Sequence, residues 1–308
     1  MSNLRQDRQP VAVIGASGFV GSAVARRLKE RGADVREISA PRISGSPGQA
    51  TKLEHQQATE EFLLAKLSGC SAVVNAAGVA DSSAVGAESV WGANAILPGL
   101  IATAASIAGI RMVHVSSAAV QGRIATLDAS DRVSGFSLYS RSKIAGEERV
   151  RQQAAKAVIY RPPGVHGPGR TVTEAVRRLA RSPLSSVASP GDDNAPQAQI
   201  GNVADAIAFL ATTPCQPPQV VVHPSEGITT SELLQALGNR KPVHVPRPLA
   251  RAIVAFSFWV SDLTPRLAAH ARRLEVLWFG QEQAPSWLTE AGWTPPIGLS
   301  GWALIEHQ

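Results

Sequence analysis

The chain has 308 residues, of which 44% are hydrophobic and 18% charged, and it carries a formal net charge of +6. A chain of this length forms one large or two medium domains with enough core to fold unaided, and its two cysteines exclude a disulfide framework. The 30 basic residues are spread along the sequence without a block of like charge, which excludes the usual footprint of a nucleic-acid-binding protein.

Short β-branched runs alternate with helical patterns over the first 165 residues. Continuous apolar runs between segments with a period near 3.6 predict a parallel sheet covered by helices on both faces. One more strand is expected near Leu53. The other predicted strands are residues 11–14, 35–39, 72–75, 112–116 and 157–160, and the predicted helices are 20–31, 59–67, 89–108 and 138–155.

The texture of the sequence changes after residue 160. Residues 161–170 contain three Pro and three Gly, which predicts a rigid, irregular turn at a strand end. Helices are predicted at 172–181 and 202–212, a strand at 219–223, and mostly helical structure after Pro224. The sequence therefore predicts an α/β fold: a Rossmann-type doubly wound domain at 1–165, rejoined by about 200–223, and a smaller, mostly helical domain at 166–199 and 224–308.

Two segments bear on membranes and export. Residues 1–10 are polar and lack the apolar core of a signal peptide. The apolar stretch 252–260 is bounded by Arg251 and Asp262 and is far shorter than the roughly 20 residues of a membrane span. We therefore expect a cytoplasmic protein with no integral membrane segment. Residues 249–263 fit first a helix that closes a pocket or packs on a partner, and second a helix on a membrane surface.

Three glycines between the first strand and the first helix, Gly15, Gly18 and Gly21, have the spacing G-x-x-G-x-x-G. Gly15 permits a tight turn, Gly18 lets backbone N–H groups approach a pyrophosphate, and Gly21 allows close contact between helix and strand. The phosphates would face the positive end of the helix dipole. This pattern predicts a dinucleotide-binding loop.

The end of the second strand bears on the choice between NAD and NADP. An acid at this point binds the ribose 2′-hydroxyl of NAD, whereas an arginine accommodates the 2′-phosphate of NADP. Here the strand ends at Ser39 and Arg42 follows, while the acidic Glu37 lies inside the strand. The pattern favours NADP, with NAD as the alternative.

Tyr139 and Lys143 form a Y-x-x-x-K pattern at the start of a predicted helix, so both side chains lie on one face. A free phenol titrates near pH 10, and an adjacent cation favours its ionised form. Ser117 follows a predicted strand at its carboxyl end, where open α/β sheets bind ligands. A surface pair has the same spacing as Tyr139 and Lys143, but the combination with Ser117 and the glycine loop favours catalysis.

Taken together, these motifs make the chain similar to extended short-chain dehydrogenases/reductases of the NAD-dependent epimerase/dehydratase type along almost its whole length. The resemblance is carried by Asn94 and by GASGFVG (15–21), NAAG (75–78), SSAAVQG (116–122), YSRSK (139–143), RPPGVHGPG (161–169), GNVADAI (201–207) and GWTPP (292–296). It implies Ser117, Tyr139 and Lys143 as catalytic residues and residues 166–199 with 224–308 as the substrate-binding domain. The cofactor-binding residues that it implies are Gly15, Ser17, Gly18, Phe19, Val20, Ser39, Arg42, Ala76, Ala77, Gly78, Asn94, Tyr139, Lys143, Pro162 and Val165, and the substrate residues are Val79, Ser117, Ala118, His166 and Arg170.

Within this family, the motifs are most similar to those of nucleotide-sugar 4-epimerases and 4-ketosugar reductases. The resemblance implies hydride transfer between NADP or NAD and a ketone or secondary alcohol, on a nucleotide sugar, in a homodimer paired through helices 89–108 and 138–155. The alternatives are an NAD-dependent 4-epimerase, a reductase of a non-sugar ketone, and a non-catalytic NADP-binding sensor or scaffold. Residues 194–197 replace the arginine that sugar-nucleotide enzymes carry, and Arg170, Arg247, Arg272 or Arg273 are the candidate substitutes. We expect no metal site and no nucleic-acid partner.

Overall fold

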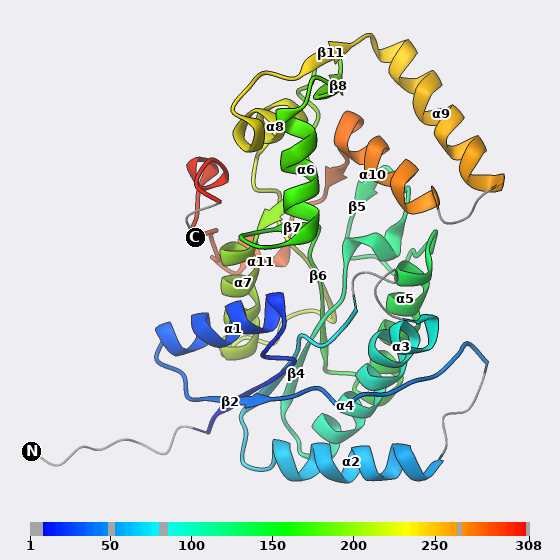
Figure 1. Ribbon diagram of the computed structural model, residues 1–308. Coiled ribbons are helices and arrows are strands. Elements are labelled where there is room, and N and C mark those ends of the chain that lie inside the picture. Colours follow the sequence, from blue (N-terminus) through cyan, green and yellow to red (C-terminus); the bar gives the residue numbers. More distant parts are fainter. Residues whose placement is uncertain (1–8, 49–52, 80–85, 264–266, 306–308) are drawn as a thin grey trace, which may run out of the picture. The chain divides into compact units, whose positions relative to one another are not determined.

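The computed structural model describes residues 9–48, 53–79, 86–263 and 267–305 (Figure 1). The chain divides into two compact units. The first comprises Met1–Val120, Leu138–Arg161 and Ala204–Val221, and the second comprises Gln121–Ser137, Pro162–Val203 and Val222–Gln308. The boundary between the units passes through helix α7 (Ile200–Thr212) and strand β10 (Val220–Val222).

A six-stranded sheet with the order β10-β6-β4-β3-β1-β2 forms the centre of the first unit. The pairs from β2 to β6 are all parallel, which confirms the predicted doubly wound sheet. Its other strands are β1 (Val11–Ile14), β2 (Val35–Ile38), β3 (Ala72–Asn75), β4 (Arg111–Val115) and β6 (Val158–Arg161).

The strand expected near Leu53 is wrong. Leu53 begins helix α2 (Leu53–Leu67), and the described residues between β2 and β3 contain no strand. Residues 53–58 are Leu-Glu-His-Gln-Gln-Ala, which are mostly good helix formers without a β-branched side chain, so the helix starts earlier than the apolar pattern alone indicates. As a result, β2 is an edge strand of the sheet.

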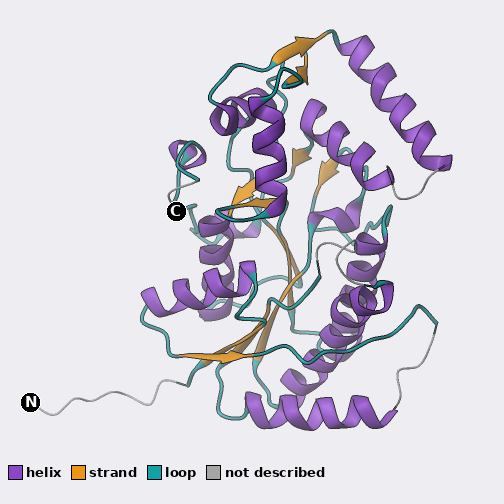
Figure 2. Ribbon diagram, in the orientation of Figure 1, coloured by secondary structure: helices purple, strands orange, loops and turns teal. Residues whose placement is uncertain are grey.

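Helices cover both faces of this sheet (Figure 2). Helix α1 (Phe19–Glu30) and α7 lie on one face, where Asp205 of α7, with its side chain 3% exposed, forms ion pairs with Arg27 and Arg31. On the other face lie α2, α4 (Leu97–Ile107) and α5 (Leu138–Gln153).

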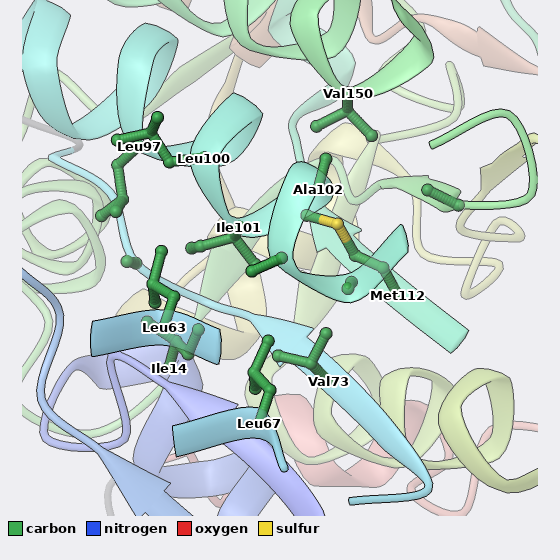
Figure 3. Close-up of a cluster of buried hydrophobic side chains, with 14 of the residues drawn as sticks. Ile14, Leu63, Leu67, Val73, Leu97, Leu100, Ile101, Ala102, Met112 and Val150 are labelled. Carbon is green, nitrogen blue, oxygen red and sulfur yellow. The ribbon is translucent and has the colours of Figure 1, made fainter. Parts of the chain in front are cut away.

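The main apolar core lies between the sheet and α2, α4 and α5 (Figure 3). Ile14, Val73 and Met112 come from three neighbouring strands and are each at most 1% exposed. Leu67 of α2 and Ile101 of α4 are fully buried against them. This layer fixes the strands whose carboxyl ends carry the predicted site residues.

The single helix predicted at 89–108 is interrupted. It consists of α3 (Ala87–Trp91), a π-helical turn η1 (Gly92–Ile96) and α4. A side chain at Gly92 would overlap the Ile43 carbonyl, so the turn meets the loop after β2 at close range. The 21 residues Ala87–Ile107 have the length and mean hydropathy, 1.4, of a membrane span, but 72% of the most apolar window is buried inside the protein, as in a core helix.

The second unit combines short parallel strand pairs with helices. The pairs are β7 (Gly164–His166) with β9 (Gln197–Gln199), β8 (Ser186–Ala188) with β11 (Val243–Val245), and β5 (Thr126–Leu127) with β12 (Glu282–Gln283). Its helices include α6 (Thr171–Arg181), α8 (Thr230–Gly238), α9 (Arg247–Leu263), α10 (Ala268–Phe279) and α11 (Trp287–Glu290), with the short turns η2 (Ala118–Gln121) at the unit boundary and η4 (Leu299–Trp302) near the end of the chain.

Candidate active site in the first unit

The glycine loop after β1 is built so tightly that side chains cannot be added to it. Gly15 has a φ of +81°, and a Cβ there would lie 2.8 Å from the Ala77 backbone nitrogen. A Cβ at Gly21 would overlap the Gly15 carbonyl. The Gly18 N–H donates to that same carbonyl at 3.0 Å and closes the turn. Only glycine fits at Gly15 and Gly21 without moving the backbone.

The first turn of α1 is an open site for an anion. Gly18 is the N-cap residue, and the turn has neither a side-chain cap nor an acidic residue. Ser17 and Gly18 are exposed, and Phe19 and Val20 are half-buried. A helix N-terminus carries a partial positive charge and backbone N–H groups without intrahelical partners. The glycine cradle and this helix end together fit the pyrophosphate of a dinucleotide.

At the end of β2 and in the loop after it, a basic side chain is exposed to solvent and the nearby acidic side chain is already paired. Ser39 and Arg42 are both exposed. The Glu37 carboxylate accepts a hydrogen bond from Lys29 Nζ at 2.6 Å, so its charge is already paired. Arg36 donates instead to the Lys66 and Ser68 carbonyls at 2.8 and 2.7 Å.

Asn94, in the π-helical turn η1, ties the segment after β3 to α5. Its Oδ1 accepts from the Val79 N–H at 2.9 Å, and its Nδ2 donates to the Val79 carbonyl at 2.9 Å and to Ser142 Oγ at 3.1 Å. A Cβ at Gly78 would lie 2.9 Å from Asn94 Oδ1 and 3.1 Å from Lys143 Nζ. A side chain at Gly78 would therefore crowd the place where Asn94 and Lys143 meet.

The backbone of Ala76 and Ala77 connects the segment after β3 to its surroundings. The Ala76 N–H donates to the Ile14 carbonyl at 3.0 Å, and the Ala77 N–H to Asn75 Oδ1 at 3.1 Å. The first bond holds the segment after β3 against the end of β1, where the glycine loop begins, and the second closes a turn within that segment.

Lys143 is anchored below the end of β4. It is 5% exposed, and its Nζ donates to the Val115 carbonyl at 2.9 Å. Burial lowers the pKa of Lys143 to about 8, against the opposing charge of Glu147, so the ammonium form still dominates at neutral pH. Tyr139 lies one turn earlier on α5 and is half-buried.

Ser117 follows β4 two residues beyond Val115. It is half-buried, its Oγ accepts from the Ala119 N–H at 3.2 Å, and its neighbour Ala118 is 8% exposed. Through Val115, the structure brings the Ser117 segment and Lys143 to the same strand end.

A buried ionic network behind Lys143 was not anticipated from the sequence. Glu147, one turn after Lys143 and 0% exposed, accepts from Arg161 Nε at 3.0 Å and from Arg161 Nη2 at 2.7 Å. It also accepts from Ser116 Oγ at 2.5 Å and Arg151 Nη2 at 3.2 Å. The network joins α5 to the ends of β4 and β6. No sequence signal reveals this network, because Glu147 and Arg161 lie on different elements.

The remaining predicted site residues lie in the second unit. Pro162 and Val165 are buried, and Arg170 is the N-cap residue of α6. His166 is 1% exposed, and both ring nitrogens are engaged, one with Gln197 Oε1 at 2.9 Å and one with Thr173 Oγ1 at 3.2 Å. Burial lowers the pKa of His166 to about 4, so it is neutral. Both ring nitrogens thus have protein partners, and the substrate role of His166 stays a prediction.

The described part of the chain contains no group of three or more His, Cys, Asp or Glu side chains that could hold a metal ion.

Comparison with known proteins adds the family. Residues 11–222 match the model of the NAD dependent epimerase/dehydratase family. The chain belongs to this family. The match spans the glycine loop, Asn94, Ser117 and the Tyr139–Lys143 pair, so the resemblance inferred from the motifs is confirmed.

Individual relatives match only part of the chain, and at low sequence identity. The chain is 31% identical over 199 residues to a ceramide reductase from Caulobacter vibrioides, covering 59% of this chain and 55% of that protein. It spans about half the length of the curated relatives that it matches.

Solved structures show the same fold at low identity. A human epimerase family protein with NADPH has a TM-score of 0.66 at 22% identity, covering 97% of this chain and 99% of that one. A dTDP-4-dehydrorhamnose reductase from Bacillus anthracis with NADP has a TM-score of 0.61 at 18% identity, covering 80% and 85%.

Proposed function

We propose that this protein is an NAD(P)-dependent reductase that converts a ketone to a secondary alcohol and catalyses the reverse oxidation. The observation that carries the proposal is the buried Lys143 ammonium, one turn from Tyr139 and bonded to the strand end that leads to Ser117. If Tyr139 and Lys143 were an ordinary surface pair, the Lys143 side chain would be exposed to solvent. Family membership supports the same reading.

The three residues have distinct roles in this proposal. Ser117 and Tyr139 hold the ketone oxygen by hydrogen bonds, and Tyr139 donates its proton to that oxygen during reduction. The Lys143 ammonium lowers the pKa of the Tyr139 phenol by favouring its ionised form. A bound nicotinamide supplies the hydride.

For the cofactor we propose NADP(H). Lys29 already neutralises Glu37, which leaves the loop after β2 without an acid for a 2′-hydroxyl, and the exposed Arg42 suits a 2′-phosphate. NAD is the alternative. A reductase needs an exchangeable cofactor, whereas a 4-epimerase retains its NAD through both half-reactions. NAD released from the denatured protein would therefore favour the epimerase.

For the substrate we propose a nucleotide sugar, in line with the motifs and with the dTDP-sugar reductase of similar fold. A ketone without phosphates is the second candidate because two of the arginines considered for phosphate binding are engaged. Arg247 donates to both carboxylate oxygens of Asp193 at 2.9 Å. Arg272 donates to Glu275, to the Gly122 carbonyl and to Gln281.

The decisive variant is Tyr139→Phe. We expect it to bind NADP(H) like the native chain and to lose at least about 100-fold in turnover, because general acid–base catalysis contributes roughly 10²–10⁴-fold. The chain has one other tyrosine, Tyr160, which is fully buried in β6, and Tyr160→Phe is the matched control. Full turnover in Tyr139→Phe would refute the proposed mechanism. A native chain that binds NADP(H) but reduces or oxidises none of a panel of carbonyl compounds and alcohols would favour a binding protein on the same fold.

A thermal-shift panel of NADP, NAD, UDP- and TDP-sugars, alone and in pairs, tests cofactor and substrate together. Ligands that bind only the folded form raise its apparent stability. A shift with NADP and no further shift with any nucleotide sugar would favour the phosphate-free ketone. We also propose that the enzyme is cytoplasmic and forms a homodimer. Sedimentation velocity tests the dimer, and cell fractionation tests the localisation.

A further inference from the structure

Helix α9 in the second unit has an apolar face on each side. Its inner face is short: Ala250 and Val254 are buried and form a cluster with Trp278 of α10. The opposite side carries large exposed side chains at helical spacing. These are Leu249, Ile253, Phe256 and Trp259, which are 54, 39, 63 and 59% exposed.

These four residues form one continuous stripe. Successive members are four, three and three residues apart, so they follow one side of the helix. The Phe256 and Trp259 rings stack with centroids 5.7 Å apart and an interplanar angle of 28°. Ala252 and Ala255, which flank Ile253 and Phe256 in the sequence, are also exposed. No polar side chain therefore interrupts the sequence from 252 to 256. Contiguous exposed apolar patches mark interaction sites.

The segment that leads to the stripe and forms it is basic up to Asp262, near the end of α9. The sequence has no acidic residue from Leu233 to Ser261. Arg240 and Lys241 precede β11, Arg251 lies in the first turns of α9, and all three are exposed. Arg247 is different, because Asp193 pairs with it. Arg251 thus provides an exposed basic side chain on α9 itself, ahead of the two aromatic rings.

We propose that α9 is a membrane-surface site that lies in the headgroup region of a bilayer containing anionic lipids. Apolar side chains on one face, with basic residues beside them, are what interfacial helices use to bind such bilayers. Trp and other aromatic rings favour the boundary between hydrocarbon and water. A second copy of the chain is the alternative occupant, and it is one of the outcomes that the test below distinguishes.

This inference goes beyond the proposed reductase activity and does not depend on it. It places the protein at a lipid surface whatever substrate the first unit takes. The Tyr139→Phe protein should therefore bind vesicles as the native chain does.

The test is co-sedimentation with vesicles of phosphatidylcholine alone and of phosphatidylcholine and phosphatidylglycerol in equal parts. We expect binding to the mixed vesicles that weakens as salt is raised, because exposed charges are screened. The double variant Phe256→Ser/Trp259→Ser should weaken binding by at least about tenfold, because two aromatic rings no longer enter the interface. Arg251→Glu should weaken binding to the mixed vesicles selectively.

The matched control is Leu184→Ser, which removes a side chain of the same unit that is 75% exposed and lies outside α9. It should bind vesicles like the native chain, and thermal unfolding checks that every variant is folded. Equal binding by the double variant and the native chain would overturn the proposal, as would the absence of binding to mixed vesicles. A stripe that instead joins two copies would show as a smaller sedimentation coefficient of the double variant without vesicles, and this too would overturn it.

Discussion

Replacing Glu147 by Gln removes the charge at the centre of the network behind Lys143. The native carboxylate is 0% exposed and accepts two hydrogen bonds from Arg161, whose side chain is also 0% exposed. The amide would leave the buried Arg161 guanidinium without the negative charge of Glu147. Breaking a buried ion pair by removing one partner costs about 3–5 kcal/mol. At roughly 2–4 °C per kcal/mol, the melting temperature should fall by roughly 6–20 °C.

The assay is thermal unfolding followed by circular dichroism, with Glu148→Gln as the control. Glu148 is the next residue on α5 and is exposed, so its substitution should change the free energy of unfolding by at most about 0.5 kcal/mol. The double variant Glu147→Leu/Arg161→Met should recover much of the loss, because apolar side chains replace buried ion pairs at little cost. Equal melting temperatures for Glu147→Gln and Glu148→Gln would refute the reasoning.

Three further predictions concern the first unit. Arg42→Ser should weaken NADP binding relative to NAD binding by about 10- to 100-fold, as expected for a lost hydrogen bond to a charged group. Arg26→Ser, which changes an exposed side chain of α1, should leave this ratio of affinities unchanged. Fluorescence titration with each cofactor measures the ratio. Gly21→Ala should abolish NADP binding in the same titration, because the new Cβ overlaps the Gly15 carbonyl, while Ser22→Ala should bind normally. The rate of ketone reduction should fall as the pH rises through about 8, where Lys143 loses the charge that assists Tyr139. Lys143→Arg should move this fall in the pH–rate profile to higher pH. A fall at the same pH in both proteins would show that another group causes it.

The sequence predicted the buried strands well, because their residues form continuous apolar runs. The apolar runs at 11–14 and 72–75 became β1 and β3 with the same bounds, because continuous apolar strands are buried on both faces. The π-helical turn at Gly92–Ile96 was not visible, since its cause is the close approach of Ile43 from a distant loop. Periodicity carries no information about such contacts.

The same limit applies to the site. The glycine spacing was readable because Gly15 has a positive φ and Gly21 packs on the carbonyl of Gly15, six residues earlier. Glu147 was missed because its partner Arg161 lies on another element, and only the fold brings the two together. His166 was assigned to the substrate by its motif, whereas its environment is set by Gln197 and Thr173 from neighbouring segments. Motifs identify residue types, and the tertiary contacts decide what is left for a ligand.

Edge strand β2 has a consequence for the protein in concentrated solution. An open sheet edge offers unpaired backbone groups to strands of other molecules, which is a route to aggregation. β2 is only four residues long, Val-Arg-Glu-Ile, and its two consecutive charged residues point to opposite faces of the sheet. Arg36 is further held by the carbonyls at the end of α2, so an incoming strand would have to displace it. The short length of β2 and its two charged side chains thus protect the sheet from association with other chains.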